Sequence, residues 1–184
     1  MRGCCLIIQL RGTSGAGKTT IVRSLIESFP KPTPIYGAFG TGQPEAIKLH
    51  RSPRPLYALG PYPAAGCDSI IGRLGVQGVI DLLEKYCARG DVIFEGLIIS
   101  SMFGRLGEWL KDHPPVIVAV LDVSIADCLA GLADRQGDKQ KTAKTLKAHY
   151  DNTFKVADKM RNISMRVEML KRQCALETIR EWLQ

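Results

Sequence analysis

Several features are missing from this chain of 184 residues, and each absence excludes a class of protein. No apolar run approaches the ~20 residues that a membrane-spanning helix needs, so a membrane protein is not expected. The short apolar stretch after Arg2 leads directly into a glycine-rich loop, and it is interpreted as a first strand rather than a signal peptide. The six cysteines include no C-x-x-C pair or other metal-binding spacing, which favours reduced thiols in a cytoplasmic protein.

The remaining composition is that of one globular domain. A chain of this length can bury a substantial core, and its 45% hydrophobic and 23% charged residues are ordinary for a soluble protein. The sequence contains no internal repeat, low-complexity tract or linker long enough to separate domains. We therefore expect a single domain over residues 1–184.

The most specific motif is the stretch from Gly12 to Thr19, Gly-Thr-Ser-Gly-Ala-Gly-Lys-Thr, which fits the P-loop pattern G-x-x-x-x-G-K-[ST]. Its glycines permit backbone conformations that turn successive N–H groups inward onto an anion. Lys18 is expected to contact the β- and γ-phosphates of ATP, and Thr19 to bind Mg²⁺. The predicted nucleotide-binding residues are Gly12, Thr13, Ser14, Gly15, Ala16, Gly17, Lys18, Thr19 and Thr20.

The flanking residues fit the motif. Leu6–Leu10 is typical of a short buried strand, and the apolar residues of Thr20–Phe29 have helical spacing up to Pro30. The loop is therefore predicted to precede a helix N-terminus, where the helix dipole favours phosphate. The sequence predicts a nucleoside triphosphate site that uses ATP and Mg²⁺.

Strands and helices alternate along the rest of the chain. Predicted strands are Asp91–Glu95, Pro115–Asp122 and Ser164–Leu170, and predicted helices are Ser69–Ala88, Ser101–Asp112, Ser124–Arg135, Thr142–Arg161 and Ala175–Leu183. Strands that are apolar throughout and alternate with helices predict an α/β fold, here a P-loop NTPase three-layer sandwich of the nucleotide-kinase kind. The P-loop and the end of the Asp91–Glu95 strand should then meet at the carboxyl edge of a parallel sheet.

Residues 31–66 are rich in proline and glycine and are interpreted as a small β-rich insertion next to the substrate site. Ala46–His50 and Leu56–Leu59 are its predicted strands. Its aromatic residues could stack on a nucleic-acid base or form the core of the insertion. They are Tyr36, Phe39, Tyr57 and Tyr62.

Two acids are candidates for the chemistry. Glu95 ends an apolar strand, as a Walker B acid does, and could hold Mg²⁺ or orient a nucleophile; alternatively it caps the following turn. Asp68 could accept the proton of an acceptor hydroxyl or serve as the N-cap of the Ser69–Ala88 helix. Residues 37–42, about twenty after Lys18, contain no acid, which leaves these two. Within that helix, Gly72, Gly75 and Gly78 are expected to let a helix or the substrate approach closely.

The positive charge is concentrated in one segment. Arg135–Arg172 contains eleven Lys and Arg against four Asp and Glu, a surplus that equals the whole net charge of +7. Arg135 is expected to open a helical lid over residues 135–161 and to neutralise charge on the transferring phosphoryl group, a function it could share with Lys139, Lys141 or Lys144; alternatively it pairs with a helix dipole. The basic segment that follows could bind a nucleic-acid backbone or, as solvated lid charges, attract ATP. Its residues are Lys144, Lys147, His149, Tyr150, Lys155, Lys159 and Arg161.

Three stretches together resemble a group of bacteriophage P-loop kinases that includes the 5-hydroxymethyluracil DNA kinases. They are Gly12–Thr19, the run from Tyr57 through Gly66-Cys67-Asp68 to Ile70, and Phe94-Glu95-Gly96 up to Ser100. The similarity extends from Leu6 to about Arg135, and Ala65 stands where the group is expected to have a second glycine. The resemblance implies transfer of the ATP γ-phosphate to the hydroxymethyl group of a modified base in phage DNA, with Lys18, Asp68, Glu95 and Arg135 as catalytic residues.

Two alternatives remain at this stage. Phe94-Glu95-Gly96 also resembles uridine-kinase-type enzymes, which favours a free nucleoside, nucleotide or other small metabolite as acceptor. The second alternative is an ATP-dependent nucleic-acid-binding module without an acceptor hydroxyl. The sequence does not indicate an oligomeric state.

Overall fold

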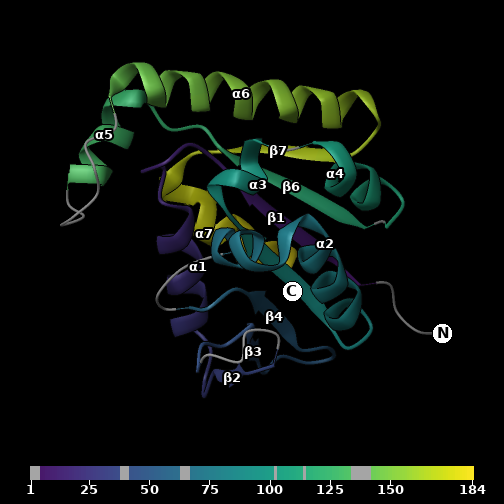
Figure 1. Ribbon diagram of the computed structural model, residues 1–184. Coiled ribbons are helices and arrows are strands. Elements are labelled where there is room, and N and C mark those ends of the chain that lie inside the picture. Colours follow the sequence, from purple (N-terminus) through teal and green to yellow (C-terminus); the bar gives the residue numbers. More distant parts are fainter. Residues whose placement is uncertain (1–4, 38–41, 63–66, 102, 114, 134–141) are drawn as a thin grey trace.

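In the computed structural model, seven strands form one sheet in the order β2-β3-β4-β5-β1-β6-β7, which is the middle layer of the molecule (Figure 1). The structure describes residues 5–37, 42–62, 67–101, 103–113, 115–133 and 142–184. The strands are β1 (Ile7–Arg11), β2 (Thr33–Ile35), β3 (Ala46–Leu49), β4 (Leu56–Leu59), β5 (Asp91–Glu95), β6 (Val116–Leu121) and β7 (Arg166–Leu170).

The five strands from β4 to β7 in the sheet order run parallel to one another, and β2 and β3 are antiparallel at one edge. Every residue of β1, β5 and β6 is buried, as expected for strands with a helix layer on each face. This arrangement confirms the predicted α/β sandwich with a parallel sheet.

Helices cover both faces of the sheet. The cores on the two faces show that α2, α4 and α6 pack on one face, with α3 against α6, and that α1, α5 and α7 pack on the other. The helices are α1 (Lys18–Glu27), α2 (Asp68–Cys87), α3 (Leu97–Ser101), α4 (Gly104–Lys111), α5 (Ile125–Ala133), α6 (Ala143–Asn162) and α7 (Arg172–Trp182). None of these helices is both long enough and apolar enough to cross a bilayer, within the residues described.

Two helix starts agree with the sequence patterns. The Ser124 hydroxyl accepts the N–H of Asp127 at 3.1 Å and donates to its carboxylate at 2.7 Å, so Ser124 caps the N-terminus of α5, where the sequence places the start of a helix. The Thr142 hydroxyl accepts the N–H of Thr145 and caps α6. The long basic helix therefore begins where the sequence predicts.

The proline-rich region contains the two predicted strands and a third, β2, which pattern did not predict. These strands extend the main sheet, because β4 pairs with β5 in parallel. A buried carboxylate, Glu45, accepts hydrogen bonds from Lys85 and Tyr86 of α2 and so attaches this edge to the helix layer. The Tyr57 ring packs against Tyr86 in a tilted arrangement with ring centroids 4.7 Å apart, so Tyr57 is a core residue rather than a base-stacking one.

The structure corrects the sequence prediction for α2. Gly75 has φ 65° and ψ −171°, so the helix is kinked in the middle of the glycine series. A Cβ added at Gly72 or Gly75 would meet no atom within 4 Å, and at Gly78 it would meet Leu74 of the same helix. Gly75 therefore permits the kink, and no neighbouring helix in the described part of the chain approaches these glycines closely; approach by the substrate stays a prediction.

Two further boundaries differ from the prediction. Cys67, and not Asp68, is the N-cap of α2, and no side chain caps this helix. The helix expected over Ser101–Asp112 is α4, Gly104–Lys111, and a short helix that was not predicted, α3, precedes it directly after Gly96. The Asp68 carboxylate contacts the first turn of α3, as described below.

Candidate active site

The P-loop lies between the carboxyl end of β1 and the start of α1, as predicted. Gly15 and Gly17 have φ of 81° and 96°, conformations that favour glycine and turn the peptide N–H groups of the loop. Thr20 is exposed one residue beyond Thr19, whereas most of the loop is buried. The loop therefore has the backbone form that the motif requires.

Lys18 is held against the loop. The residue is only 6% exposed, and its ammonium group donates to the backbone oxygens of Gly12 at 2.8 Å and Thr13 at 3.1 Å. A cation is thereby kept at the predicted phosphate site instead of moving in solvent. This geometry leaves few conformations for the side chain to lose when an anion binds.

Glu95 contacts the P-loop directly, as the Walker B interpretation requires. The Thr19 hydroxyl donates to Glu95 Oε1 at 3.0 Å, and the Tyr62 hydroxyl donates to the same oxygen at 3.2 Å. Burial raises the pKa of the Glu95 carboxyl; the positive charge of Lys18 and the bond from Thr19 oppose this, and the negative charge of Asp68 adds to it. The structure thus brings Thr19, Lys18, Asp68 and Glu95 together.

Two of the three stretches that carry the phage-kinase resemblance, those with Asp68 and with Glu95, meet at this point. Asp68 Oδ1 accepts the N–H of Ile98 at 2.9 Å, in the first turn of α3. A Cβ on Gly96 would lie 2.4 Å from that oxygen, so only glycine allows the carboxylate to approach. The N–H of Cys67 donates to the Glu95 carbonyl at 3.0 Å. Asp68 therefore fixes the segment that follows Glu95.

Two residues behind the loop were not predicted from the sequence. Arg11 is fully buried and donates to Gln9 Oε1 at 2.8 Å and to the Ser100 carbonyl at 3.0 Å, and burial lowers its pKa to about 9. The Ser100 hydroxyl accepts the N–H of Gly12 at 3.2 Å and donates to the Gly96 carbonyl at 2.5 Å. An arginine directly before a P-loop was the available signal for this link between β1 and α3.

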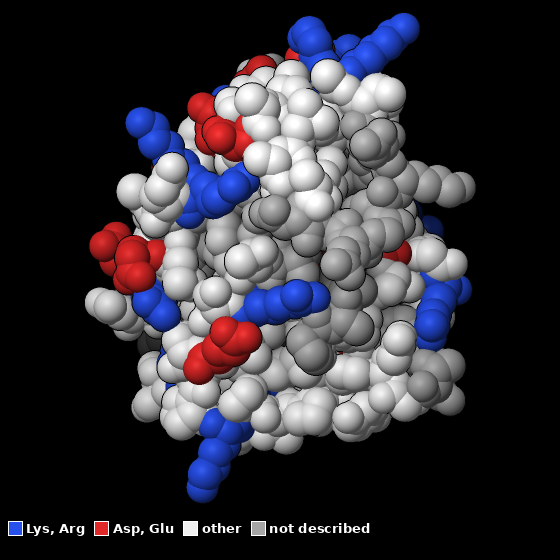
Figure 2. Space-filling view, turned by 90° about the vertical axis from the view of Figure 1, so that its left-hand side faces the viewer, with Lys and Arg blue, Asp and Glu red and all other residues white. Residues whose placement is uncertain are grey.

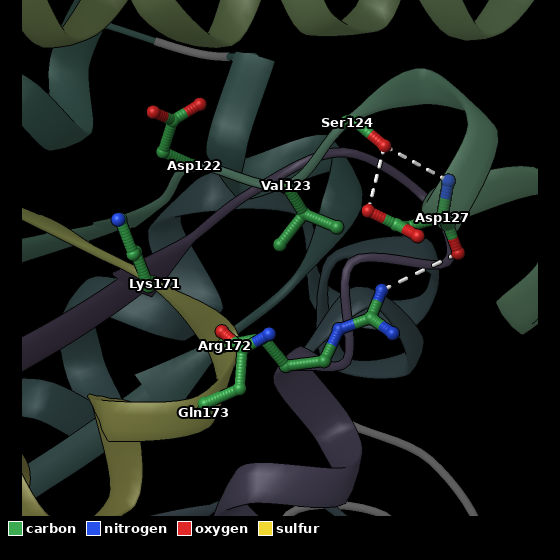
Figure 3. Close-up of a pocket in the computed structure, with 7 residues that line it drawn as sticks. All are labelled: Asp122, Val123, Ser124, Asp127, Lys171, Arg172 and Gln173. Carbon is green, nitrogen blue, oxygen red and sulfur yellow. Dashed lines mark hydrogen bonds between the residues drawn. The ribbon is translucent and has the colours of Figure 1, made fainter.

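A third unpredicted residue, Arg172, holds the loop from the other side. Its guanidinium donates to the carbonyls of Gly15 at 2.8 Å and Ala16 at 3.0 Å, and more weakly to Asp127 at 3.4 Å. Arg172 also lines a cavity of about 270 Å³, which we call the polar cavity (Figure 3). Its lining residues are Asp122, Val123, Ser124, Asp127, Lys171, Arg172 and Gln173.

A second cavity of about 430 Å³ has Tyr62 in its wall, and we call it the apolar cavity. It lies between α1 and the edge formed by β2 and β3. Its lining residues are Arg23, Ile26, Glu27, Pro32, Pro34, Tyr36, Pro44, Ile47 and Tyr62. Because the Tyr62 hydroxyl is bonded to Glu95, the P-loop acid and this cavity are directly connected.

The predicted lid arginine and its neighbours lie outside the described residues. These are Arg135, Lys139 and Lys141. Phe39, in the proline-rich region, lies outside them as well.

The basic residues of α6 are spread along its exposed side. Lys147 pairs with Asp151 and Arg161 with Asp158, each at 2.8 Å, and the Tyr150 hydroxyl donates to Asp122. The helix lies at the opposite end of the sheet from β2 and β3 (Figure 1). In Figure 2, which faces the left-hand side of Figure 1, the described Lys and Arg side chains lie apart, several beside Asp or Glu.

A divalent ion would find few protein ligands here. Among the described residues, no group of three or more His, Cys, Asp or Glu could hold a metal. Mg²⁺, however, is commonly bound by one or two carboxylates together with substrate phosphates and water. The oxygen pair of Thr19 and Glu95, 3.0 Å apart beside the P-loop, fits that requirement.

Comparison with solved structures gives partial similarity. The fold aligns with a gluconokinase from Sinorhizobium meliloti 1021 (TM-score 0.46, 12% identity, 96% of this chain and 86% of that chain). It also aligns with the deoxyadenosine kinase from M. mycoides with bound dATP (TM-score 0.49, 12% identity, 96% of each chain).

Comparison with known sequences is more specific. No protein-family model matches the chain. The protein called 5-hmdU DNA kinase from Pseudomonas phage PaMx11 is 29% identical over 187 aligned positions, which cover 97% of each chain. The protein of the same name from Pseudomonas phage M6 is 30% identical over 143 positions, covering 72% of this chain and 73% of the relative. The chain has a P-loop between a strand and a helix, and the threonine of that loop is bonded to an acid. Together with the similarity to these relatives, this shows that the chain is a P-loop kinase and belongs to the phage 5-hmdU DNA kinase family.

Proposed function

We propose that this kinase transfers the γ-phosphate of ATP to the hydroxymethyl group of 5-hydroxymethyluracil in DNA. The observation that carries the reaction is the contact of Glu95 with Thr19 on one side and Tyr62 on the other, because it connects the P-loop to the apolar cavity. The names of the two phage relatives support the choice of acceptor.

The donor half of the site would hold ATP. The backbone N–H groups of residues 12–20 and the ammonium of Lys18 would contact its phosphates. The polar cavity, which Arg172 joins to the loop, would take the ribose and base. Thr19 would hold Mg²⁺, and Glu95 would accept from the ion's water shell; the ion supplies neutralisation of charge on the phosphates.

Glu95 is proposed to take the proton of the acceptor hydroxyl. The raised pKa of the buried Glu95 carboxyl is closer to the pKa range in which a general base works. As the proton moves to Glu95, the hydroxyl oxygen bonds to the γ-phosphorus. The bond from that phosphorus to the bridging oxygen breaks, and ADP leaves.

Asp68 is proposed as a positioning residue. Its Oδ1 is bonded to Ile98 and lies against Gly96, so it fixes the backbone that follows Glu95. Arg135 is proposed, from its place in the sequence after α5, to neutralise the charge of the transferring phosphoryl group.

Transfer of label from γ-labelled ATP tests this proposal. The acceptors would be DNA containing 5-hydroxymethyluracil, unmodified DNA of the same sequence, and a panel of free nucleosides. We expect label in the modified DNA alone. Label only in a nucleoside would keep the kinase and overturn the DNA acceptor, whereas ATP consumption without transfer would overturn both.

A further inference from the structure

We propose that the apolar cavity receives the acceptor base of the DNA strand, taken out of the base stack and inserted between α1 and the β2–β3 edge. This proposal rests on the proposed function and adds the site at which the substrate is recognised. An enzyme that reacts with a group on a base in DNA must expose that group, and a pocket for the flipped base is the usual solution.

The position of the cavity is the first argument. Tyr62 is 2% exposed and forms part of the cavity wall, while its hydroxyl donates to Glu95 Oε1 at 3.2 Å. The same carboxylate oxygen accepts from Thr19 of the P-loop. A group held at the Tyr62 end of the cavity is therefore one side chain away from the acid and the phosphate site.

The shape and chemistry of the walls are the second argument. The volume of about 430 Å³ lies within the range of about 300–1,000 Å³ that is usual for small-ligand pockets. Three proline rings, two isoleucines and two tyrosines form most of the lining. Flat apolar surfaces of this kind bind a planar ring by stacking and by excluding water.

Tyr36 provides an aromatic ring at the rim. Its side chain is 58% exposed, the most exposed large hydrophobic among the described residues. The backbone beside it is fixed, because the Glu45 N–H donates to Ile35 at 2.8 Å and Gly37 packs against the buried Glu45 carboxylate. An exposed ring on a fixed backbone can stack on a base at little entropic cost.

Two charged side chains also line the cavity. Arg23 and Glu27 are one turn apart on α1. A guanidinium supplies donors and a carboxylate supplies acceptors. A pyrimidine carries carbonyl acceptors and an N–H donor on its edge, which such groups can satisfy.

Substitutions at Tyr36 provide the first test. In Tyr36→Ala the KM for DNA containing 5-hydroxymethyluracil should rise about tenfold, because one base–aromatic stack is lost. The KM for ATP should stay within about twofold, and Tyr36→Phe should restore most of the acceptor affinity. Met169→Ala, an exposed residue of β7 outside both cavities, is the control.

Photochemical crosslinking locates the base independently of turnover. An oligonucleotide with 5-iodouracil at the acceptor position would be irradiated with the wild-type protein, and the crosslinked peptides identified by mass spectrometry. We expect the adduct on Tyr36 or Tyr62. An adduct confined to other regions, together with an unchanged acceptor KM in Tyr36→Ala, would overturn this cavity as the base site.

The experiments distinguish a failure of the proposed function from a failure of the proposed base site. If the wild-type protein labels modified DNA but Tyr36→Ala has unchanged kinetics, the proposed function stands and the base site is wrong. If the wild-type protein labels only free nucleosides, the DNA acceptor is wrong. A rise in nucleoside KM in Tyr36→Ala would then assign the cavity to a free base and overturn the strand-bound occupant proposed above.

Discussion

The polar and apolar cavities lie near the same P-loop but have different walls. The polar cavity is lined mainly by charged and hydrogen-bonding residues before and at the starts of α5 and α7, whereas the apolar cavity is lined mainly by proline, isoleucine and tyrosine. Arg172 joins the first to the loop, and Tyr62 joins the second to Glu95. Fixed charges and donors suit a nucleotide with its phosphates, and flat apolar walls suit a base.

We infer that the two cavities have different roles, with Glu95 between them. On the donor side, two cations hold the loop itself: the buried Lys18 bonds to its carbonyls from within, and the partly buried Arg172 from outside. On the acceptor side, the contacts that fix the wall, such as Glu45 with Lys85, lie behind the cavity surface. Substitutions on the two sides should therefore change different kinetic constants.

Lys18→Ala should have the largest effect. Removal of the cation that is proposed to contact the transferring phosphate should lower phosphoryl transfer by about a thousandfold or more, since such donors act mainly in the transition state. Initial rates of label transfer measure this, with the exposed Lys111→Ala of α4 as control. A near-normal rate in Lys18→Ala would contradict the donor site.

Glu95→Gln should lower the rate by about a hundredfold and should also change its pH dependence. Burial raises the pKa of Glu95, so wild-type kcat/KM should fall as pH drops through that raised value, which lies above the ordinary ~4.3. Glutamine cannot titrate, so this acidic limb should be absent in the variant. An identical pH profile in both proteins would exclude Glu95 as the base.

Arg172→Gln tests the donor side specifically. Loss of the bonds to Gly15 and Ala16 should raise the KM for ATP about tenfold and leave the KM for DNA unchanged. Arg172→Lys should recover only part of the affinity, because lysine lacks the planar fork. Equal effects on both substrates would show that the two cavities do not act separately.

Asp68→Asn should have the smallest effect, about a fewfold loss in kcat. Asparagine keeps an oxygen that can accept the Ile98 N–H, so the backbone after Gly96 should stay in place. Asp68→Ala removes that acceptor and should lose more activity, together with thermal stability. A hundredfold loss in Asp68→Asn with unchanged stability would make Asp68 the base.

Sequence patterns predicted the donor site because its elements are local. The P-loop, the strand before it and the helix after it lie within residues 6–29, and Glu95 follows from an apolar strand ending in an acid. Arg172 could not be predicted in this way, because it bonds to Gly15 across a separation of 157 residues. The roles of Arg11 and Ser100 could not be predicted for the same reason, because their contacts join β1 to α3.

The acceptor side was harder to predict, because side-chain orientation decides each role. Tyr57 and Tyr62 are five residues apart, yet one packs under α2 and the other lines the apolar cavity. Asp68 looked like the cap of its own helix, but its carboxylate reaches the N–H of Ile98, thirty residues away. A local sequence pattern predicts neither the orientation of these side chains nor a contact across thirty residues.

Product analysis is the most direct test of the central claim. DNA containing 5-hydroxymethyluracil would be incubated with the kinase and ATP, digested to nucleosides and analysed by mass spectrometry. The account predicts a 5-hydroxymethyluracil nucleoside that has gained one phosphoryl group on its hydroxymethyl oxygen, in amounts equal to the ADP formed. Unchanged 5-hydroxymethyluracil with ADP and free phosphate would contradict it.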